Sequence, residues 1–344
     1  MAVRHILTID GGGVRGLVPA IVLEAIDAEL KTIGKDCVLA DCFDLIAGTS
    51  VGSIIAAGLA LPSQDGGPGL TPSDLRRLFE EEASTIFPPK FLHNIPVIGR
   101  LPQLFGPLHS PAPLMSVLEK NLGDMVFASA RRNLMITSYS IDPRDMVLFR
   151  GGPAYQTKEE GDRFGMVRVR DAVTGSAAAP TFFPPHKIDN PKMKTSWTAI
   201  DGGVYVNDPA MTAVAEAIRL FPDDELNVIS LGTGRQTRIY PFDRARQWGF
   251  SQWVSPTGRF RTPLLSAIQD GQARAVNRQL NYILGKKNYT RFDYMLEKGR
   301  GSDRLDDASR KNIAQLTRGS LEMVEQMRPK IRSLAERLQP TQGT

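Results

Sequence analysis

The sequence FDLIAGTSVGSIIAAGLAL, residues 43–61, contains an apolar run, a serine flanked by glycines and a second apolar run. Phe43 to Ala47 has the length and composition of a buried strand. Gly48 to Gly52 is typical of a tight turn, and the apolar residues from Ser53 to Leu61 indicate a buried helix. A strand, a glycine turn and a helix in this order are typical of parallel α/β folds.

The N-terminus has the same arrangement. Val3 to Ile9 is a largely apolar run that ends at Asp10 and a glycine cluster. Leu17 to Thr32 then carries apolar residues at helical spacing and stops before Gly34. Two such units predict an α/β fold with a central, mostly parallel sheet that is covered by helices.

Further elements are expected along the chain. The strands are predicted at residues 134–141, 146–150, 197–200 and 226–231, and the helices at 72–83, 172–179 and 209–220, with mostly helical sequence after about Pro263. Ile86 to Pro113 holds seven prolines among apolar residues. This segment is interpreted either as a packed, irregular insertion or as a lid or lipid-contact surface.

Composition limits the function classes. The formal charge of +5 favours anionic lipid headgroups or nucleic acid, or is simply a solvated basic surface. Because the basic residues are scattered, we do not expect nucleic acid as a partner. Cys37 and Cys42 are the only cysteines, which indicates a reduced, cytoplasmic setting. The N-terminus lacks a signal-peptide pattern, and no window has about 18 uninterrupted apolar residues. We therefore expect transient, peripheral membrane contact.

The serine turn is the first candidate for chemistry. Gly48-Thr49-Ser50-Val51-Gly52 is a G-x-S-x-G pentapeptide between a predicted strand and a predicted helix. In that position the flanking glycines, Gly48 and Gly52, allow a sharp turn that exposes the hydroxyl of Ser50 at a helix N-terminus. The alternative interpretation is a glycine-rich turn with an N-capping serine.

The glycine loop is the second candidate. Its sequence is Asp10-Gly11-Gly12-Gly13-Val14-Arg15-Gly16, at a strand end and a helix start. Adjacent glycine amides favour an anion there, either as an oxyanion hole, with Arg15 lending charge or fixing the loop, or as a phosphate cradle. Gly11, Gly13 and Gly16 also fit the dinucleotide pattern, with Glu29 or Asp36 as the ribose-binding acid.

Asp201-Gly202-Gly203 is the third candidate, because it follows the strand predicted at 197–200. If that strand is parallel, its carboxyl end lies at the same sheet edge as the serine turn, which permits a pair of Ser50 and Asp201. The histidines are His5, His93, His109 and His186, and none follows Asp201 as a Ser-Asp-His order requires. A serine activated directly by an aspartate needs fewer assumptions, although His186 after Asp142 or Asp171 satisfies the order formally.

Together these motifs resemble the anion-binding loop, nucleophile elbow and Asp-Gly-Gly motif of patatin-like phospholipases. Supporting stretches also resemble the family: residues 176–185, Asn207-Asp208-Pro209-Ala210 and residues 230–234. Asn207-Asp208 departs from the more usual Asn-Asn. The resemblance covers residues 5–235 strongly and the remainder only in its helical character.

The resemblance implies a three-layer α/β/α fold, a Ser50–Asp201 dyad and an oxyanion hole from the Gly11–Gly13 loop. It also implies calcium independence, with no metal and no cofactor. We expect residues 1–240 to form the catalytic domain and residues 241–344 to form a mainly helical extension packed on the same domain.

The mechanism that follows is a hypothesis. Asp201 accepts the Ser50 proton as the serine attacks a fatty-acyl ester of a membrane lipid, the loop amides hold the oxyanion, and water releases the fatty acid from an acyl-enzyme. A dry pocket is expected to raise the pKa of Asp201. Two alternatives stay open: a nucleotide- or phosphate-binding module without hydrolysis, and an acyltransferase that uses the same acyl-enzyme.

Overall fold

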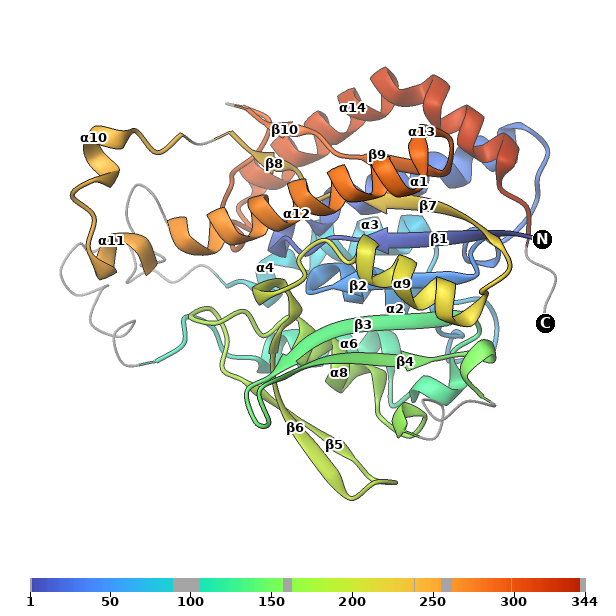
Figure 1. Ribbon diagram of the computed structural model, residues 1–344, viewed down its shortest axis with the longest axis horizontal. Helices are drawn as coiled ribbons and strands as arrows, with labels where there is room; N and C mark the ends of the chain where they lie inside the picture. Colours follow the sequence, from blue (N-terminus) through green and yellow to red (C-terminus); the bar gives the residue numbers. More distant parts are fainter. Residues whose placement is uncertain are drawn as a thin grey trace.

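The computed structural model describes residues 2–88, 106–156, 163–237, 239–254, 262–297 and 299–340. Its centre is a parallel array of strands (Figure 1). The array consists of β3 (Asn133–Ser140), β2 (Leu45–Thr49), β1 (Val3–Ile9), β7 (Glu225–Leu231) and β9 (Tyr289–Phe292), in that spatial order.

Three further strands extend this sheet beside β3. Strand β4 (Asp145–Gly151) runs antiparallel along one edge of β3, and β6 (Thr195–Asp201), which pairs with β5 (His186–Asn190), runs antiparallel along part of the other edge. The sheet order is therefore β5-β6-β3-β2-β1-β7-β9, with β4 on β3. The expected α/β fold with a mostly parallel sheet is confirmed. A separate small sheet joins β8 (Arg235–Gln236) to β10 (Met295–Leu296).

Helices cover both faces of the sheet. The larger core lies under α1 (Leu17–Thr32), α2 (Val51–Ala60), α3 (Pro72–Glu81), α4 (Ala83–Ile86), α6 (Ala112–Leu122), α8 (Val169–Ser176) and α14 (Arg310–Arg337). The opposite face is covered by α9 (Ala210–Leu220) and α12 (Pro263–Ile283), followed by α13 (Gly285–Asn288). Two short helices, α10 (Phe242–Ala245) and α11 (Phe250–Val254), precede α12.

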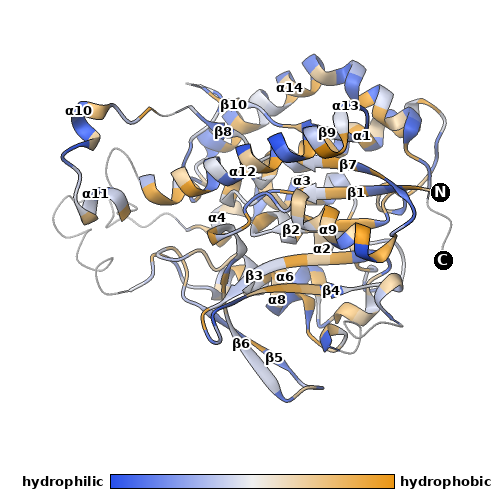
Figure 2. Ribbon diagram, in the orientation of Figure 1, coloured by the Kyte–Doolittle hydropathy of each residue, from blue (hydrophilic) through white to orange (hydrophobic). Residues whose placement is uncertain are grey.

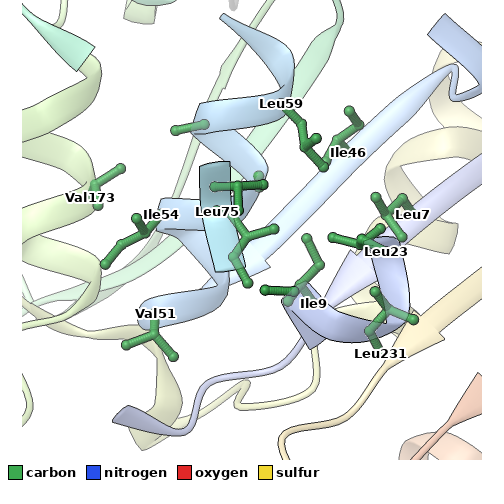
Figure 3. Packing of buried hydrophobic residues seen from close by; sticks show 14 of the residues in the cluster. Leu7, Ile9, Leu23, Ile46, Val51, Ile54, Leu59, Leu75, Val173 and Leu231 are labelled. Atoms are coloured by element: carbon green, nitrogen blue, oxygen red, sulfur yellow. The ribbon is translucent and has the colours of Figure 1, made fainter. Parts of the chain in front are cut away.

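The alternation of side chains along the strands explains the layers. Leu7 and Ile9 of β1 join the larger core with Ile46 of β2 (Figure 3), whereas Ile6 and Leu45 join the smaller core under α9 and α12. Apolar residues on successive positions of each strand therefore bury both faces, as is usual for parallel strands. The outer helices α12 and α14 are amphipathic, and orange and blue alternate along both in Figure 2.

Most predicted elements agree with the structure, with shifts of a few residues at their ends. Strand β2 ends at Thr49 rather than Ala47, so α2 begins immediately after Ser50. Strands β5 and β9 were not expected, because β5 is short and mostly polar and β9, at four residues, is too short to show a pattern. Of the proline-rich segment 86–113, residues 89–105 lie outside the described residues, and Ala112 begins α6.

One prediction about the sheet is wrong. The strand that precedes Asp201 was expected to be parallel, but β6 runs antiparallel to β3. Strand β4 occupies one edge of β3, so β2 and β6 share the other: β2 pairs up to Thr49 with Thr137, and β6 continues with Asp201 opposite Ser138. Strand β6 therefore runs in the direction opposite to β2, and its last residue, Asp201, lies beside the end of β2.

The C-terminal third contributes to the sheet as well as to the helical layers. Strand β9 pairs in parallel with β7, and α14 packs along α1. The expected division at residue 240 stays a prediction. Within the described part of the chain, no helix is long and apolar enough to cross a membrane.

Candidate active site

Ser50 lies in a strained turn between β2 and α2. Its backbone has φ 55° and ψ −127°, a conformation that a residue with a side chain rarely adopts. Glycines are required on both sides, because a Cβ at Gly48 would lie 2.2 Å from the Gly52 carbonyl oxygen and one at Gly52 would lie 2.3 Å from that of Ile9. The turn thus places the Ser50 side chain at the N-terminus of α2.

Asp201 is the hydrogen-bond partner of this serine. The Ser50 Oγ donates to Asp201 Oδ2 over 2.7 Å, and the Gly203 amide donates to Asp201 Oδ1 over 2.6 Å. Gly202 and Gly203 begin a short 3-10 helix, Gly202–Val204, directly after β6. The carboxylate is therefore held on both oxygens, with one oxygen directed at the serine hydroxyl.

Burial changes the proton affinity of this carboxylate. Both side chains are buried, and burial raises the pKa of Asp201 to about 6 although the hydrogen bonds from Ser50 and Gly203 oppose the shift. The shift has the direction expected from the sequence. An aspartate with this pKa is mostly ionised at neutral pH and is a stronger base than an exposed aspartate.

The serine backbone is also fixed. The Ser50 amide donates to the Ser176 Oγ over 2.9 Å, so the end of α8 supports the turn. Ser53 donates its hydroxyl hydrogen to the Ser50 carbonyl. These contacts hold the strained turn in one conformation.

The glycine loop lies beside the pair, and its amides are not equivalent. Gly11 donates its N–H to the Asn207 carbonyl over 3.0 Å, so it is engaged and does not suit an oxyanion. Among the residues that the structure describes, the amides of Gly12 and Gly13 have no acceptor. Gly12, Gly13, Ser50 and Asp201 all line one pocket. The candidate oxyanion donors are therefore Gly12 and Gly13.

Arg15 fixes the glycine loop through hydrogen bonds to backbone carbonyls. It is buried, and its guanidinium donates to the carbonyls of Gly12, over 3.1 Å, and Gly234, over 3.2 Å. Gly16 is the N-cap of α1, where an added Cβ would lie 2.6 Å from the Phe79 ring. Of the two roles considered for Arg15, this geometry fits the one of fixing the loop.

The dinucleotide alternative does not fit the positions of its acidic residues. Glu29 lies in the last turns of α1, roughly 18 Å along the helix axis from Leu17, and pairs with Arg332 over 3.2 Å. Asp36 follows the end of α1. Both acids are thus at the opposite end of α1 from the glycine loop.

The histidine alternative finds no support in the described residues. His5 lies near the start of β1, His109 pairs with Asp306 over 3.4 Å, and His186 lies 3.5 Å from Asp171. None of these three forms a hydrogen bond with Ser50 or Asp201 among the described residues. His93 lies outside the described residues.

Comparison with known proteins agrees with this arrangement of motifs. The family model described as patatin-like phospholipase matches residues 7–214. This chain belongs to the patatin-like phospholipase family. At the level of the family, the chain is therefore grouped with lipid acyl hydrolases.

Its relatives are similar over most of their length. Patatin-like protein 1 of Arabidopsis thaliana is 31% identical over 335 residues, which cover 90% of this chain and 79% of that protein. Patatin-like protein 2 of Oryza sativa subsp. indica is 29% identical, with 91% and 82% covered. A Solanum tuberosum relative named probable inactive patatin-3-Kuras 1 is 28% identical, with 90% and 83% covered.

The pocket of this patatin-like chain is mostly apolar. Among the described residues, its polar side chains are Ser50, Asp201, Asn207 and Gln269, and the walls come from several elements. The apolar walls include Val51 and Ile54 of α2, Phe79 of α3, Phe182 and Phe183 after α8, and Leu265 and Leu305 from the C-terminal third. An apolar chain attached to an ester can lie against these walls with its carbonyl at Ser50.

Sequence reasoning missed the residue that supports the loop electrostatically. Arg291, at the third position of β9, donates to Asp10 over 2.6 Å, to Asp208 over 3.0 Å and to Asp293 over 3.0 Å. Burial lowers the pKa of Arg291, but the three carboxylates outweigh this and hold its pKa above the usual range. Burial raises the pKa of Asp10 and that of Asp208, with Arg291 opposing both shifts. The sequence did not point to Arg291, because it lies in a short strand that was not predicted.

This ion cluster joins three parts of the patatin-like site. Asp10 begins the glycine loop, Asp208 follows Asn207, Arg291 lies in β9 and Asp293 directly follows that strand. Asp208 is the position that departs from the more usual Asn-Asn of the family, and here its charge is paired. No group of three or more potential metal ligands suited to hold an ion is found in the described ranges.

Proposed function

We propose that this chain is a serine lipid acyl hydrolase that cleaves fatty-acyl esters of membrane lipids through a Ser50–Asp201 dyad. The observation that carries the proposal is the 2.7 Å hydrogen bond between the Ser50 hydroxyl and the buried Asp201 carboxylate. Membership of the patatin-like phospholipase family supports the substrate class.

The first half-reaction forms an acyl-enzyme. Ser50 Oγ attacks the ester carbonyl carbon while its proton passes to Asp201 Oδ2, and the carbonyl oxygen becomes an oxyanion. Amides of Gly12 and Gly13, with the N-terminus of α2, stabilise this negative charge. The intermediate then expels the alcohol, which takes the proton from Asp201.

The second half-reaction repeats these steps with water. Asp201 accepts a proton from water as the water oxygen attacks the acyl-enzyme, and the proton returns to Ser50 Oγ as the fatty acid leaves. The pKa of about 6 suits both roles, because the carboxylate is ionised before attack and holds a proton better than an exposed aspartate does. Arg15 and Arg291 act through the loop rather than on the ester.

The test compares the native chain with Ser50→Ala and Asp201→Asn. Native protein should react with a fluorescent phosphonate and release fatty acid from mixed phospholipid vesicles, and both variants should lose at least 10³-fold in release. Equal rates in all three proteins would refute the dyad. Transfer of the acyl group to an added alcohol in place of water would indicate an acyltransferase, and binding of nucleotide without phosphonate labelling would indicate the phosphate-binding alternative.

A further inference from the structure

Residues 239–254, here called the aromatic arm, expose apolar side chains to an unusual degree. The arm contains α10 and α11 and projects from the body beside the start of α12 (Figure 1). Phe242 is 76% exposed, Phe250 83% and Ile239 79%. Exposed aromatic side chains gathered on a projection mark a surface that binds something apolar.

A small aromatic cluster holds the arm in shape. The Tyr240 and Trp248 rings pack edge to face with centroids 5.4 Å apart, and the Trp248 and Trp253 rings pack likewise at 5.1 Å. Phe242 and Phe250 take no part in these ring contacts. The aromatic cluster therefore orders the arm, and the Phe242 and Phe250 side chains remain exposed on it.

The arm adjoins the pocket of the proposed active site. Helix α11 packs against α12, whose first turns expose Leu264 and Ile268. Leu265 and Gln269, on those same turns, line the pocket that contains Ser50. The arm thus packs against the helix that supplies one wall of the pocket.

The charges on the arm point to the chemistry of its partner. Arg244 and Arg246 are exposed between the two phenylalanines, and Asp243 is the only acidic residue from 239 to 254. Tryptophan and tyrosine favour the interface between water and lipid, and arginine favours anionic headgroups. Aromatic and arginine side chains are also enriched at protein interfaces, so the feature that favours a lipid surface is the adjoining apolar pocket that contains Ser50.

We propose that the aromatic arm docks this chain on a bilayer that contains anionic lipid, with Phe242 and Phe250 entering the interface. Docking by the arm would bring the adjoining first turns of α12, and with them one wall of the pocket, to the lipid surface. The delivery of substrate rests on the proposed function, whereas the docking itself does not.

The test measures binding to vesicles of dialkyl-ether lipids, which have no ester to cleave. Vesicles of ether phosphatidylcholine alone are compared with an equal mixture of ether phosphatidylcholine and ether phosphatidylglycerol. Two of the three tryptophans lie in the arm and the third, Trp197, is buried. Native protein should sediment with the mixed vesicles, with tryptophan emission shifted to shorter wavelength and quenched by brominated lipid.

Variants locate the surface. Phe242→Ser with Phe250→Ser should weaken partitioning on the order of tenfold, because two aromatic side chains lose their burial. Arg244→Gln with Arg246→Gln should weaken binding to the mixed vesicles only. Tyr282→Ser is the matched control, since Tyr282 is 82% exposed but lies about 27 Å along α12 from Leu264, and it should bind like the native chain.

The outcomes separate the two proposals. Partitioning of the phenylalanine variant equal to that of the native chain, with circular dichroism showing both folded, would overturn the docking role. A change in its mass by light scattering without a change in vesicle binding would show instead that the arm joins two copies, which also overturns it. Native binding by Ser50→Ala is expected, and arm-dependent binding by a chain without esterase activity would refute only the proposed function.

Discussion

The Ser50 Oγ lies 2.7 Å from the Asp201 Oδ2, although the two residues are 151 positions apart. They meet because β2 and β6 occupy successive parts of the same edge of β3, one ending at Thr49 and the other at Asp201. Gly203 fixes the second carboxylate oxygen. The protonation state of Asp201 should therefore govern both the activity and part of the stability.

The pH dependence of hydrolysis should follow Asp201. Because the ionised carboxylate is the base, kcat/KM for a soluble ester should rise with pH through about 6 and then level off. Initial rates across the pH range measure this. His186→Gln should keep the same midpoint, since His186 lies against Asp171. A midpoint that moves in His186→Gln would argue against an aspartate base.

Asp201→Asn should stabilise the fold at neutral pH. The pKa of Asp201 is about 6 in the folded chain against 3.8 unfolded, so the folded state binds the proton more tightly. The favourable contribution is present below about pH 4 and is lost as pH rises through about 6, leaving a cost of up to about 3 kcal/mol. Urea unfolding at about pH 8 should show the gain, and at about pH 4 it should vanish. A gain that is the same at both pH values would contradict this.

Gly52→Ala should destabilise the protein by about 1–3 kcal/mol, because the added Cβ would lie 2.3 Å from the Ile9 carbonyl oxygen of β1. Gly271→Ala is the matched control, since it lies inside α12 with nothing within 4 Å of the added Cβ. That change should stabilise by roughly 0.5–1 kcal/mol. Free energies of unfolding from urea titrations distinguish the two, and similar values would refute the close packing of the turn.

Arg291→Met should cost about 3–5 kcal/mol in the free energy of unfolding, because it leaves buried carboxylates without their cation. The exposed pair of Arg274 and Asp270, 2.8 Å apart, provides the control. Arg274→Met should cost less than about 1 kcal/mol. A small effect of Arg291→Met would show that the buried acids are protonated and need no partner.

Ser176→Ala should lower kcat about tenfold and the stability by about 1 kcal/mol, because Ser50 loses the acceptor of its amide. Ser129→Ala removes a hydroxyl that only bonds the Val126 carbonyl at the surface, and it should leave kcat unchanged. Steady-state kinetics on a soluble ester measure both. An unchanged kcat in Ser176→Ala would show that the turn holds its conformation without this contact.

Much of the fold, the Ser50 turn, the glycine loop and the Asp201-Gly202-Gly203 motif follow from local sequence pattern. Apolar runs beside glycine turns predicted β1, α1, β2 and α2 to within a few residues, because burial on both faces of a parallel strand demands such runs. Strands β5 and β9 were not predicted, because five and four residues are too short for a clear pattern and pairing with neighbouring strands stabilises them. The role of Arg291 was not predicted either, because Arg291 lies in β9.

The sequence by itself determined the turn at Ser50, the glycine loop and the Asp-Gly-Gly motif, because each depends on backbone conformations that only a few neighbouring residues control. Tertiary structure alone decided which of these groups meet and in what state. The antiparallel course of β6 brings Asp201 to Ser50, the Asn207 carbonyl accepts the hydrogen bond of the Gly11 amide, and burial raises the pKa of Asp201. Distance and desolvation are properties of the packed chain, so no local pattern contains them.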